Sequence, residues 1–517
     1  MKNFPLAIYA AQHWVDHARY DNVFSTVEFA MQRLFDPTKP HFATWVWIFN
    51  MDYPFRDIMI TTRPSPPGAN PLYYATLCGF RDLVEHLIAT RPQGINAQGG
   101  IYSSPLHAAV VKRNVDIAKL LLDHGADMAA WNYDGSNPLH QASGNGHLDV
   151  IGMFLDHHAD VDSKDSDGNT PLMMASLQGE LEAAQVLLQH NATVDCRDND
   201  GHTPLMNASL HGHREVVHLL LQNGASVDSR DNDGLTPLVL ASQNGHLDVV
   251  RLLIQNGATV DSCDKDGQTP LMFASNHGRL DVVHLLLQNG ATGDSRDKYG
   301  QTPLMFASIY GRLDIVRLLL QNGATVNSHD KNGRTPLIFA SNHGRVDIVR
   351  LLLQNGATVD SRHNDGWTPL VFASLKGHLD VVRLLLQNGA TVDSYHNSGC
   401  TSLIFASLKG HLDIVRLLLQ SGADVNICAN DGFTSLMSAS FNGYVDVARL
   451  LLQNGATVDN RHNDGLTSLM FASKNGHSNV VRLLLQNGVA VDSYHDNSRI
   501  PSSGTWRYRP SSRAAVP

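Results

Sequence analysis

Cysteine is scarce in this sequence, and its distribution argues against two common kinds of site. The five cysteines are scattered, and no two of them stand in the C-x-x-C spacing of zinc or redox motifs. They are Cys78, Cys196, Cys263, Cys400 and Cys428. His13 and His17 stand four residues apart, which suits two imidazoles on one metal, but no third ligand accompanies them in the motif. We therefore expect no disulfide framework and no metal site.

Basic charge is also in short supply. The chain has 39 Lys and Arg against 49 Asp and Glu, a formal net charge of −10, so we expect no nucleic-acid partner. The longest aromatic and apolar run, residues 42–49, is too short to cross a bilayer. Gln12 and His13 interrupt any signal-like core near the N-terminus. We expect a protein of the cytoplasm, with the nucleus as the alternative, and no membrane partner.

Two sequence motifs of enzymes are missing as well. The chain contains no Gly-Lys dipeptide, so it offers no G-x-x-x-x-G-K-[ST] loop, whose backbone N–H groups would cradle phosphates. No Gly-x-Ser-x-Gly elbow supports a serine nucleophile. We predict no catalytic residue, no cofactor and no small-molecule substrate, and neither binding nor hydrolysis of ATP or GTP.

The chain does contain a sequence motif that repeats every 33 residues. Thirteen segments carry it, the first at Asn70-Pro71-Leu72 and the last at Thr467-Ser468-Leu469. One copy reads T-P-L-M-F-A-S from residue 269, L-D-V-V from residue 280 and L-L-L-Q-N-G-A from residue 285. A period of this length indicates an array in which each unit contacts only its neighbours.

The residues of one copy predict a pair of helices. A threonine N-cap followed by proline, as at Thr269, starts the first helix, because proline loses nothing at the first helical position. Gly278 ends it, and Gly290 closes the second helix in a left-handed conformation. Leu280, Val283, Leu286 and Leu287 predict an apolar face on the second helix. The following Ala-Thr-x-Asp-Ser to Asp-x-x-Gly stretch predicts a turn-rich loop, here called the finger.

This pattern resembles the ankyrin-repeat family over about four-fifths of the chain, since a period near 33 with T-P-L-x-x-A opening a helix is its signature. The resemblance implies an all-α solenoid with short finger turns or hairpins. It also implies a non-enzymatic scaffold that binds protein partners in a concave groove lined by fingers and first helices.

The flanks of the array predict three further segments. Residues 1–60 do not repeat, and their apolar spacing predicts a short helical segment that could cap the first repeat. Residues 61–69 are rich in proline and predict a linker. The array itself takes residues 70–496, and residues 497–517, rich in Ser, Pro and Arg, predict a disordered tail.

The N-terminal segment carries a second resemblance. The words Y-A-A-Q-H-W-V-D-H-A-R from residue 9 and L-F-D from residue 34, followed by K-P-H-F and W-V-W, resemble a segment of fungal STAND proteins. In that family the segment joins a NACHT-type nucleotide triphosphatase to an ankyrin array. The resemblance implies an alternative role, the sensor arm of a signalling triphosphatase whose nucleotide-binding module is missing from this chain.

The positions that differ between otherwise similar repeats indicate candidate partner-binding residues. The finger aspartate becomes His363, His396, Ala429, His462 and His495 in the later repeats. The residue directly before the capping threonine, here called the pre-threonine position, changes from repeat to repeat, as does the end of the first helix. Exposed aromatic residues at such positions are typical of binding hot spots. The candidates are Leu235, Trp367, Phe433, Leu466, His211, Tyr310, Lys376 and Phe441.

A methionine and phenylalanine stripe offers a different interpretation. The residue after T-P-L is methionine in several copies, as at Met173, Met206 and Met272, and phenylalanine often follows, as at Phe273 and Phe306. A ligand groove would fit this composition. A core between repeats fits it better, because flexible methionine fills gaps against aromatic edges.

Overall fold

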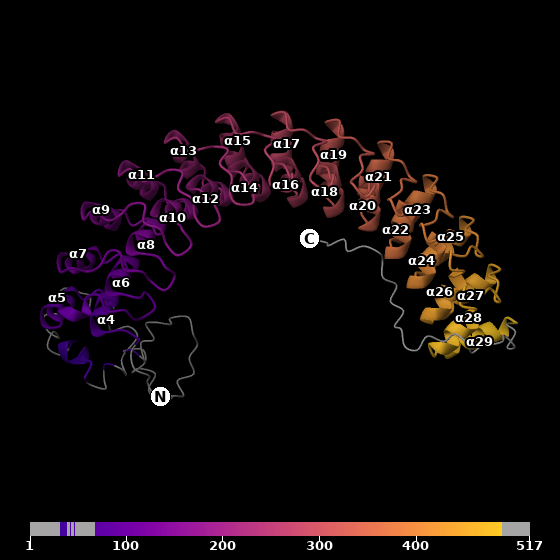
Figure 1. The fold of residues 1–517 in the computed structure, drawn as a ribbon, viewed down its shortest axis with the longest axis horizontal. Coiled ribbons are helices and arrows are strands. Elements are labelled where there is room, and N and C mark those ends of the chain that lie inside the picture. The colour runs from indigo at the N-terminus through magenta and orange to yellow at the C-terminus, as the bar shows by residue number, and fades with distance from the viewer. Residues whose placement is uncertain (1–30, 39–41, 43–45, 47–67, 489–517) are drawn as a thin grey trace. The chain divides into compact units, whose positions relative to one another are not determined.

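The computed structural model describes residues 31–38, 42, 46 and 68–488, which fall into two compact units, unit 1 (Met1–Lys331) and unit 2 (Asn332–Pro517). In each unit the described residues form pairs of short helices stacked in chain order (Figure 1). Most of the predicted N-terminal helical segment and linker, and the whole predicted tail, lie outside the described residues.

Unit 1 holds eight helix pairs in its described part. The first helices are α4 (Pro71–Cys78), α6 (Pro105–Val111), α8 (Pro138–Gly144), α10 (Pro171–Gln178), α12 (Pro204–His211), α14 (Pro237–Asn244), α16 (Pro270–His277) and α18 (Pro303–Tyr310). The second helices are α5 (Arg81–Thr90), α7 (Val115–Asp123), α9 (Leu148–Asp156), α11 (Leu181–Gln189), α13 (Arg214–Gln222), α15 (Leu247–Gln255), α17 (Leu280–Gln288) and α19 (Leu313–Gln321). A 3-10 turn, η1 (Pro92–Gly94), follows α5.

Unit 2 holds five more pairs among its described residues. The first helices are α20 (Pro336–Asn342), α22 (Pro369–Lys376), α24 (Ser402–Lys409), α26 (Ser435–Asn442) and α28 (Ser468–Lys474). The second helices are α21 (Val346–Gln354), α23 (Leu379–Gln387), α25 (Leu412–Gln420), α27 (Val445–Gln453) and α29 (Ser478–Gln486). Within residues 68–488 the β-structure is limited to two isolated bridges, Tyr395 with Thr401 and Cys428 with Thr434. The predicted all-α fold of repeated helix pairs is confirmed.

The predicted helix starts are confirmed by their capping bonds. Thr203 Oγ1 accepts a hydrogen bond from the Met206 N–H at 3.3 Å, and Pro204 takes the first helical position. Where serine replaces proline in unit 2, the cap persists, because Thr401 Oγ1 still accepts from the Ile404 N–H at 3.4 Å. The cap therefore resides in the threonine, which satisfies an otherwise unpaired N–H at the helix end.

The predicted helix ends are confirmed as well. Gly278 follows α16 with a φ of 79°, in the left-handed region. A Cβ at this position would stand 2.9 Å from the guanidinium carbon of the flexible Arg312 side chain, which can move, so it is the backbone conformation that favours glycine there. Gly290 has a φ of 86° one residue beyond the C-cap of α17.

The apolar face of the second helix differs in part from the prediction. Val283 and Leu286 of α17 are fully buried, as expected, but Leu280 is 39% exposed and Leu287 is only half-buried. Val282 and Leu285 are buried instead. The buried face is centred near Leu286, and at 100° per residue the helix carries positions 280 and 287 to its flank.

The methionine and phenylalanine stripe belongs to the core between repeats, as the preferred interpretation held. Met173, Met206 and Met272 are fully buried. Phe306 and Phe405 are 7% and 2% exposed, whereas Phe273 and Phe372 are half-buried. First helices pack against first helices of adjacent repeats in both units, as α10 does against α8 and α12.

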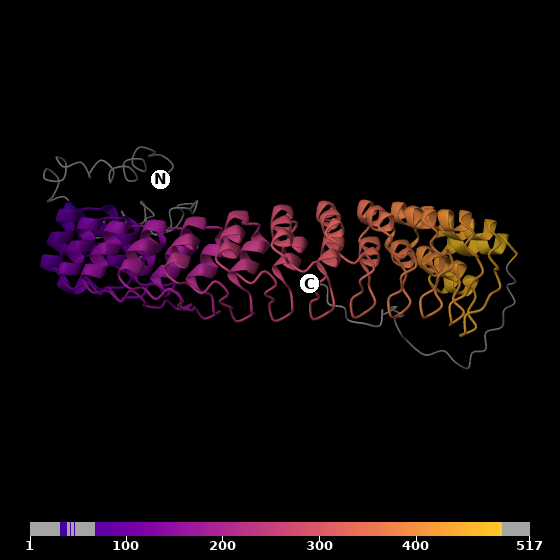
Figure 2. The same cartoon turned by 90° about the horizontal axis from the view of Figure 1, so that it is seen from above.

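The fingers extend from one edge of the helix pairs in each unit (Figure 2). Consecutive fingers are joined by a side-chain hydrogen bond: the Asp261 carboxylate accepts from the Thr292 hydroxyl at 2.6 Å and from the Thr292 N–H at 3.0 Å. Asp360 and Thr391 make the same pair of bonds in unit 2. Within each unit, the repeats that carry this bond are thereby tied to the next one at the finger as well as through their helices.

The few described residues of the N-terminal segment cover the first repeat. Phe35 is fully buried and meets the Phe80 ring edge-on at 6.3 Å between centroids. Phe42 meets the Tyr74 ring in the same way at 5.8 Å. These contacts give the first helix pair an apolar cover in place of a preceding repeat.

Candidate functional site

Five fingers of unit 1 are organised around an aspartate, and Asn132 takes its place in an earlier one. Asp264 Oδ1 accepts hydrogen bonds from the N–H groups of Asp266 at 2.9 Å and Gln268 at 2.7 Å. This geometry explains why the repeat keeps aspartate there, since a short carboxylate can cap two backbone donors of its own turn. The same two bonds are made by Asp165, Asp198, Asp231 and Asp297.

Histidine takes over this task in three fingers of unit 2, and Ala429 stands at this position in another. His396 Nδ1 accepts from the Ser398 N–H at 3.1 Å, and His363 and His462 accept from Asp365 and Asp464 in the same way at 3.0 and 3.2 Å. An imidazole nitrogen that accepts must be unprotonated, so the bond at His396 requires the neutral ring. Burial lowers the pKa of His396, which favours that form. The sequence alone gave these histidines no role.

The pre-threonine side chains lie over the first helices and against the next finger. Trp367 stacks on Phe372 of its own repeat and on Phe405 of the next, with ring centroids 4.9 Å apart in both cases. It also lies 4.6 Å from the His396 ring. Trp367 is thus half-buried within an aromatic cluster, and its part in partner binding stays a prediction.

Phe433 is held in a second aromatic cluster of unit 2. Its ring meets Phe471 at 5.4 Å and His462 at 5.9 Å. Phe441, at the end of α26, meets the same Phe471 ring at 5.9 Å, so the structure brings these two candidates together. Leu235 and Leu466 are half-buried at the pre-threonine position of their own repeats.

Three candidates at the ends of first helices are exposed. His211, Tyr310 and Lys376 each precede the glycine that ends their helix, and Tyr310 is 39% exposed. His211 Nδ1 lies 3.0 Å from the Asn207 carbonyl oxygen, which fixes its ring against the helix end. These three positions present different chemistry, imidazole, phenol and ammonium, from equivalent places on the scaffold.

The helix-one phenylalanines are the partners that the sequence did not assign to this surface. Phe372, Phe405 and Phe471 hold the pre-threonine rings of Trp367 and Phe433 in place. Their 33-residue spacing was visible, but spacing cannot distinguish a wholly internal core from a core that also supports a surface.

Two buried histidines of unit 1 have lowered pKa values. His107 is fully buried, and its desolvation lowers its pKa to about 4, although its ring bonds the Ser136 carbonyl oxygen at 3.2 Å. Burial likewise lowers the pKa of His140, whose ring lies 2.9 Å from the Asn169 carbonyl oxygen. Both therefore act as neutral hydrogen-bond bridges to the next finger.

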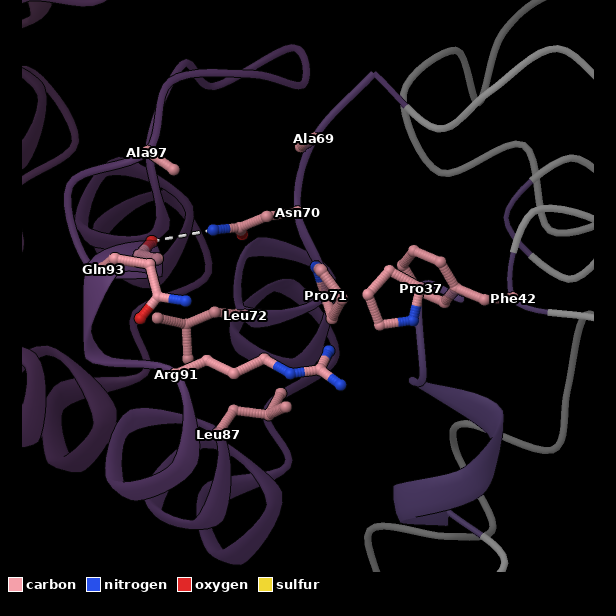
Figure 3. Close-up of a pocket in the computed structure, with 11 residues that line it drawn as sticks. Pro37, Phe42, Ala69, Asn70, Pro71, Leu72, Leu87, Arg91, Gln93 and Ala97 are labelled. Carbon is pink, nitrogen blue, oxygen red and sulfur yellow. Dashed lines mark hydrogen bonds between the residues drawn. The ribbon is translucent and has the colours of Figure 1, made fainter. Parts of the chain in front are cut away.

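A cavity of about 490 Å³ lies between the N-terminal segment and the first repeat (Figure 3). Its walls include Pro37, Phe42 and Leu72, and Asn70 Nδ2 donates to the Gly94 carbonyl oxygen across one side at 2.7 Å. The Arg91 guanidinium lines the cavity and pairs with Asp36 at 3.5 Å. The cavity thus combines apolar walls with one cation that is already partnered.

The described part of the chain holds no cluster of three or more His, Cys, Asp or Glu arranged to bind a metal ion. None of its helices is long and apolar enough to span a membrane. Burial raises the pKa of the Cys400 thiol, which disfavours the thiolate that a cysteine nucleophile needs.

Comparison with known proteins agrees with the repeat architecture. A family model described as ankyrin repeats (3 copies) matches residues 72–165, 139–231, 226–297, 292–363, 355–429 and 422–495. A curated protein of Monascus ruber, azaphilone pigments biosynthesis cluster protein L, is 35% identical over 139 residues. That match covers 25% of this chain and 29% of the relative, so the chain spans under a third of the relative's length.

Proposed function

Because the chain belongs to the ankyrin-repeat family, whose repeats serve as protein-interaction scaffolds, we propose that it is a non-enzymatic scaffold that binds a protein partner. The binding surface is formed by the pre-threonine residues of the fingers and by the ends of the first helices. The residues assigned to it are Leu235, Trp367, Phe433, Leu466, His211, Tyr310, Lys376 and Phe441.

One observation carries this proposal. The caps, glycines and core leucines repeat almost without change, whereas His211, Tyr310 and Lys376 differ at equivalent, exposed positions. Exposed side chains that vary on a constant scaffold supply specificity without altering the fold. Trp367 and Phe433 contribute in a different way, because their half-buried rings give the surface a rigid aromatic floor.

The test is a capture experiment with matched variants. Replacing His211, Tyr310 and Lys376 by alanine should abolish capture of partners that the wild-type chain retains. The control replaces His218, Arg317 and Arg383, exposed residues on the second helices of the same three repeats, and should retain capture. Equal capture by both triple variants, with unchanged melting temperatures, would refute the assigned surface.

The compartment is part of the same proposal. All five cysteines, which lie in the described part of the chain, are free thiols, and free thiols suit a reducing environment. We place the protein in the cytoplasm or the nucleus. Imaging of a fluorescent fusion in the cells that express the gene tests this, and a signal confined to the secretory pathway would contradict it.

A second candidate function rests on the N-terminal sequence motifs that resemble the segment of fungal STAND proteins. In this version the array is the sensor arm of a NACHT-type triphosphatase supplied by a longer chain or by a separate protein. A reading frame upstream that encodes a Gly-Lys-Ser or Gly-Lys-Thr loop would favour it. Micromolar ATP affinity of this chain alone, measured by calorimetry, would contradict both versions.

A further inference from the structure

The two units differ sharply in charge. Residues 68–331 of unit 1 contain 30 Asp and Glu against 17 Lys and Arg, a formal net charge of −13. Residues 332–488 of unit 2 contain 11 against 12, a net charge of +1. The acidic excess of the chain is therefore carried by one unit, and it concentrates in fingers that each hold several aspartates, such as Asp261, Asp264 and Asp266.

One carboxylate in these fingers has an unused oxygen. Asp297 is only 6% exposed, and its Oδ1 accepts from the N–H groups of Tyr299 and Gln301 at 2.9 and 2.7 Å. Its Oδ2 is buried and has no hydrogen-bond partner. Burial raises the pKa of Asp297, and the nearby carboxylates of Asp330 and Asp266 raise it further. A buried, unpaired carboxylate oxygen is costly, so native structures rarely keep one without a use.

In an earlier repeat, a histidine side chain lies next to the carboxylate oxygen equivalent to Asp297 Oδ2. His202 stands at the pre-threonine position, and its two ring nitrogens lie 3.4 Å from Asp198 Oδ2 and 3.4 Å from Asp231 Oδ2. The ring therefore bridges the carboxylates of two consecutive fingers. Gln301 stands to Asp297 and Asp330 as His202 stands to Asp198 and Asp231, and it leaves Asp297 Oδ2 unpaired.

The geometry points to the unit 1 fingers as a docking surface for a lysine- and arginine-rich segment of the protein partner, with one cationic side chain reaching Asp297 Oδ2 in place of Gln301. This inference rests on the proposed scaffold function and adds the chemistry of the partner. Gln301 is half-buried, so part of its surface remains open to solvent.

Charge complementarity selects this occupant over the alternatives. A net charge of −13 repels nucleic acid, and the described residues hold no cluster of three or more His, Cys, Asp or Glu arranged to bind a metal ion. Charged donors form the strongest hydrogen bonds to carboxylates, and long-range attraction to an acidic surface speeds association. Binding should therefore weaken with added salt.

The test uses the full chain and a fluorescein-labelled peptide with six arginines spaced by glycine and serine, followed by fluorescence anisotropy at low salt. The wild-type chain should bind the peptide, and Asp297→Asn should weaken binding at least fivefold. Asp281→Asn, an exposed change on α17 that alters net charge equally, should weaken it less than twofold. Gln301→His, which builds the bridge seen at His202, should weaken binding without changing the formal charge.

The outcomes separate this inference from the proposed function. No binding by the wild-type chain overturns it, as does an equal loss for Asp297→Asn and Asp281→Asn, which would show attraction to bulk charge only. Asp297→Asn should also raise the melting temperature, because it removes an unpaired buried charge. A stabilised variant that binds the peptide normally would make Asp297 a structural residue and overturn the inference, while capture of a non-basic partner by the wild-type chain would leave the scaffold function standing.

Discussion

Unit 1 and unit 2 build the same turn with different acceptors. In unit 1 a carboxylate such as Asp264 satisfies two backbone N–H groups of the finger, whereas in unit 2 an imidazole such as His396 satisfies one. The pre-threonine side chains change in parallel, from Gln268 and Gln301 in unit 1 to Trp367 and Phe433 in unit 2. The exchange removes charge and adds aromatic surface, so the finger is a position where the fold tolerates a change of chemistry.

This difference shows that the residues that build the helix pairs and the residues that form the finger surface can change independently. The threonine cap, the left-handed glycine and the buried leucines recur in both units, although Thr302 makes no side-chain cap bond and Arg113, His158 and Asn191 replace the glycine. The finger acceptor needs only a short side chain that can receive a backbone N–H, a condition that aspartate and neutral histidine both meet. Each unit can thus present its own surface on a shared frame.

The largest expected effect on stability comes from removing an aromatic pre-threonine side chain of unit 2. Trp367→Ala removes a ring stacked on Phe372 and Phe405, and we expect it to lower the free energy of unfolding by about 2–3 kcal/mol, below the range for fully buried rings. Leu235→Ala, at the same position in unit 1, should cost about 1 kcal/mol. Urea denaturation measures both. Equal losses would mean that the unit 2 cluster adds nothing to stability.

Acid should loosen the core of unit 1 specifically. The pKa of His107 falls from an ordinary 6.5 to about 4 on folding, so the unfolded chain binds more protons between those values and stability is lost as pH falls through them. The loss at pH 5 should reach about 2 kcal/mol. His107→Met, which installs the residue of later repeats, should flatten this dependence in urea titrations at pH 7.5 and 5.0. Unchanged pH dependence would assign the acid sensitivity elsewhere.

The far end of unit 2 should open first. Leu485 of α29 is 45% exposed, and no further repeat is present among the described residues to cover it, whereas α4 and α5 are covered by Phe35 and Phe42. Hydrogen exchange should show the lowest protection after Thr467 and the highest within residues 200–370, a difference of at least about 1 kcal/mol in opening free energy. Uniform protection to residue 488 would contradict this.

The smallest expected effect is a difference in pH dependence between the histidine acceptor of unit 2 and the aspartate acceptor of unit 1. Protonation of His396 removes the lone pair that receives the Ser398 N–H, and since burial lowers the pKa of His396, that bond is lost only as pH falls below its ordinary range. We expect the Ser398 amide to lose about 1 kcal/mol of protection at pH 5, and the amides bonded to Asp198 in unit 1 to serve as the reference. His396→Asp should restore protection; loss in both units would refute the distinction.

Sequence reasoning recovered the fold because its determinants are local and repeated. The T-P-L start, the glycine stops and the 33-residue period each act within one repeat, and the structure places all thirteen pairs where they predict. The error at Leu280 arose because several leucines and valines offer more than one apolar stripe, and only packing against neighbours selects the face centred on Leu286.

The site was harder to predict because it depends on contacts between repeats. Trp367 looks free in the sequence, since no scaffold rule calls for bulk before the threonine, and the ring that holds it, Phe405, is 38 residues away. His202 and Asp231 likewise meet only across a repeat boundary. The finger histidines carry no motif, so their role as turn acceptors follows only from the bond lengths.

The hydrogen bond from Thr292 to Asp261 has a consequence for how such a gene can change. The same joint recurs at identical separation between Thr193 and Asp162, Ser226 and Asp195, Thr259 and Asp228, Thr325 and Asp294, and Thr391 and Asp360. Deleting or duplicating one 33-residue period by unequal crossing-over would join a donor to an acceptor that already fits it. Copy number is therefore free to drift at little structural cost, except at junctions such as Asp393 and Asp424, where a carboxylate faces the backbone of another acid.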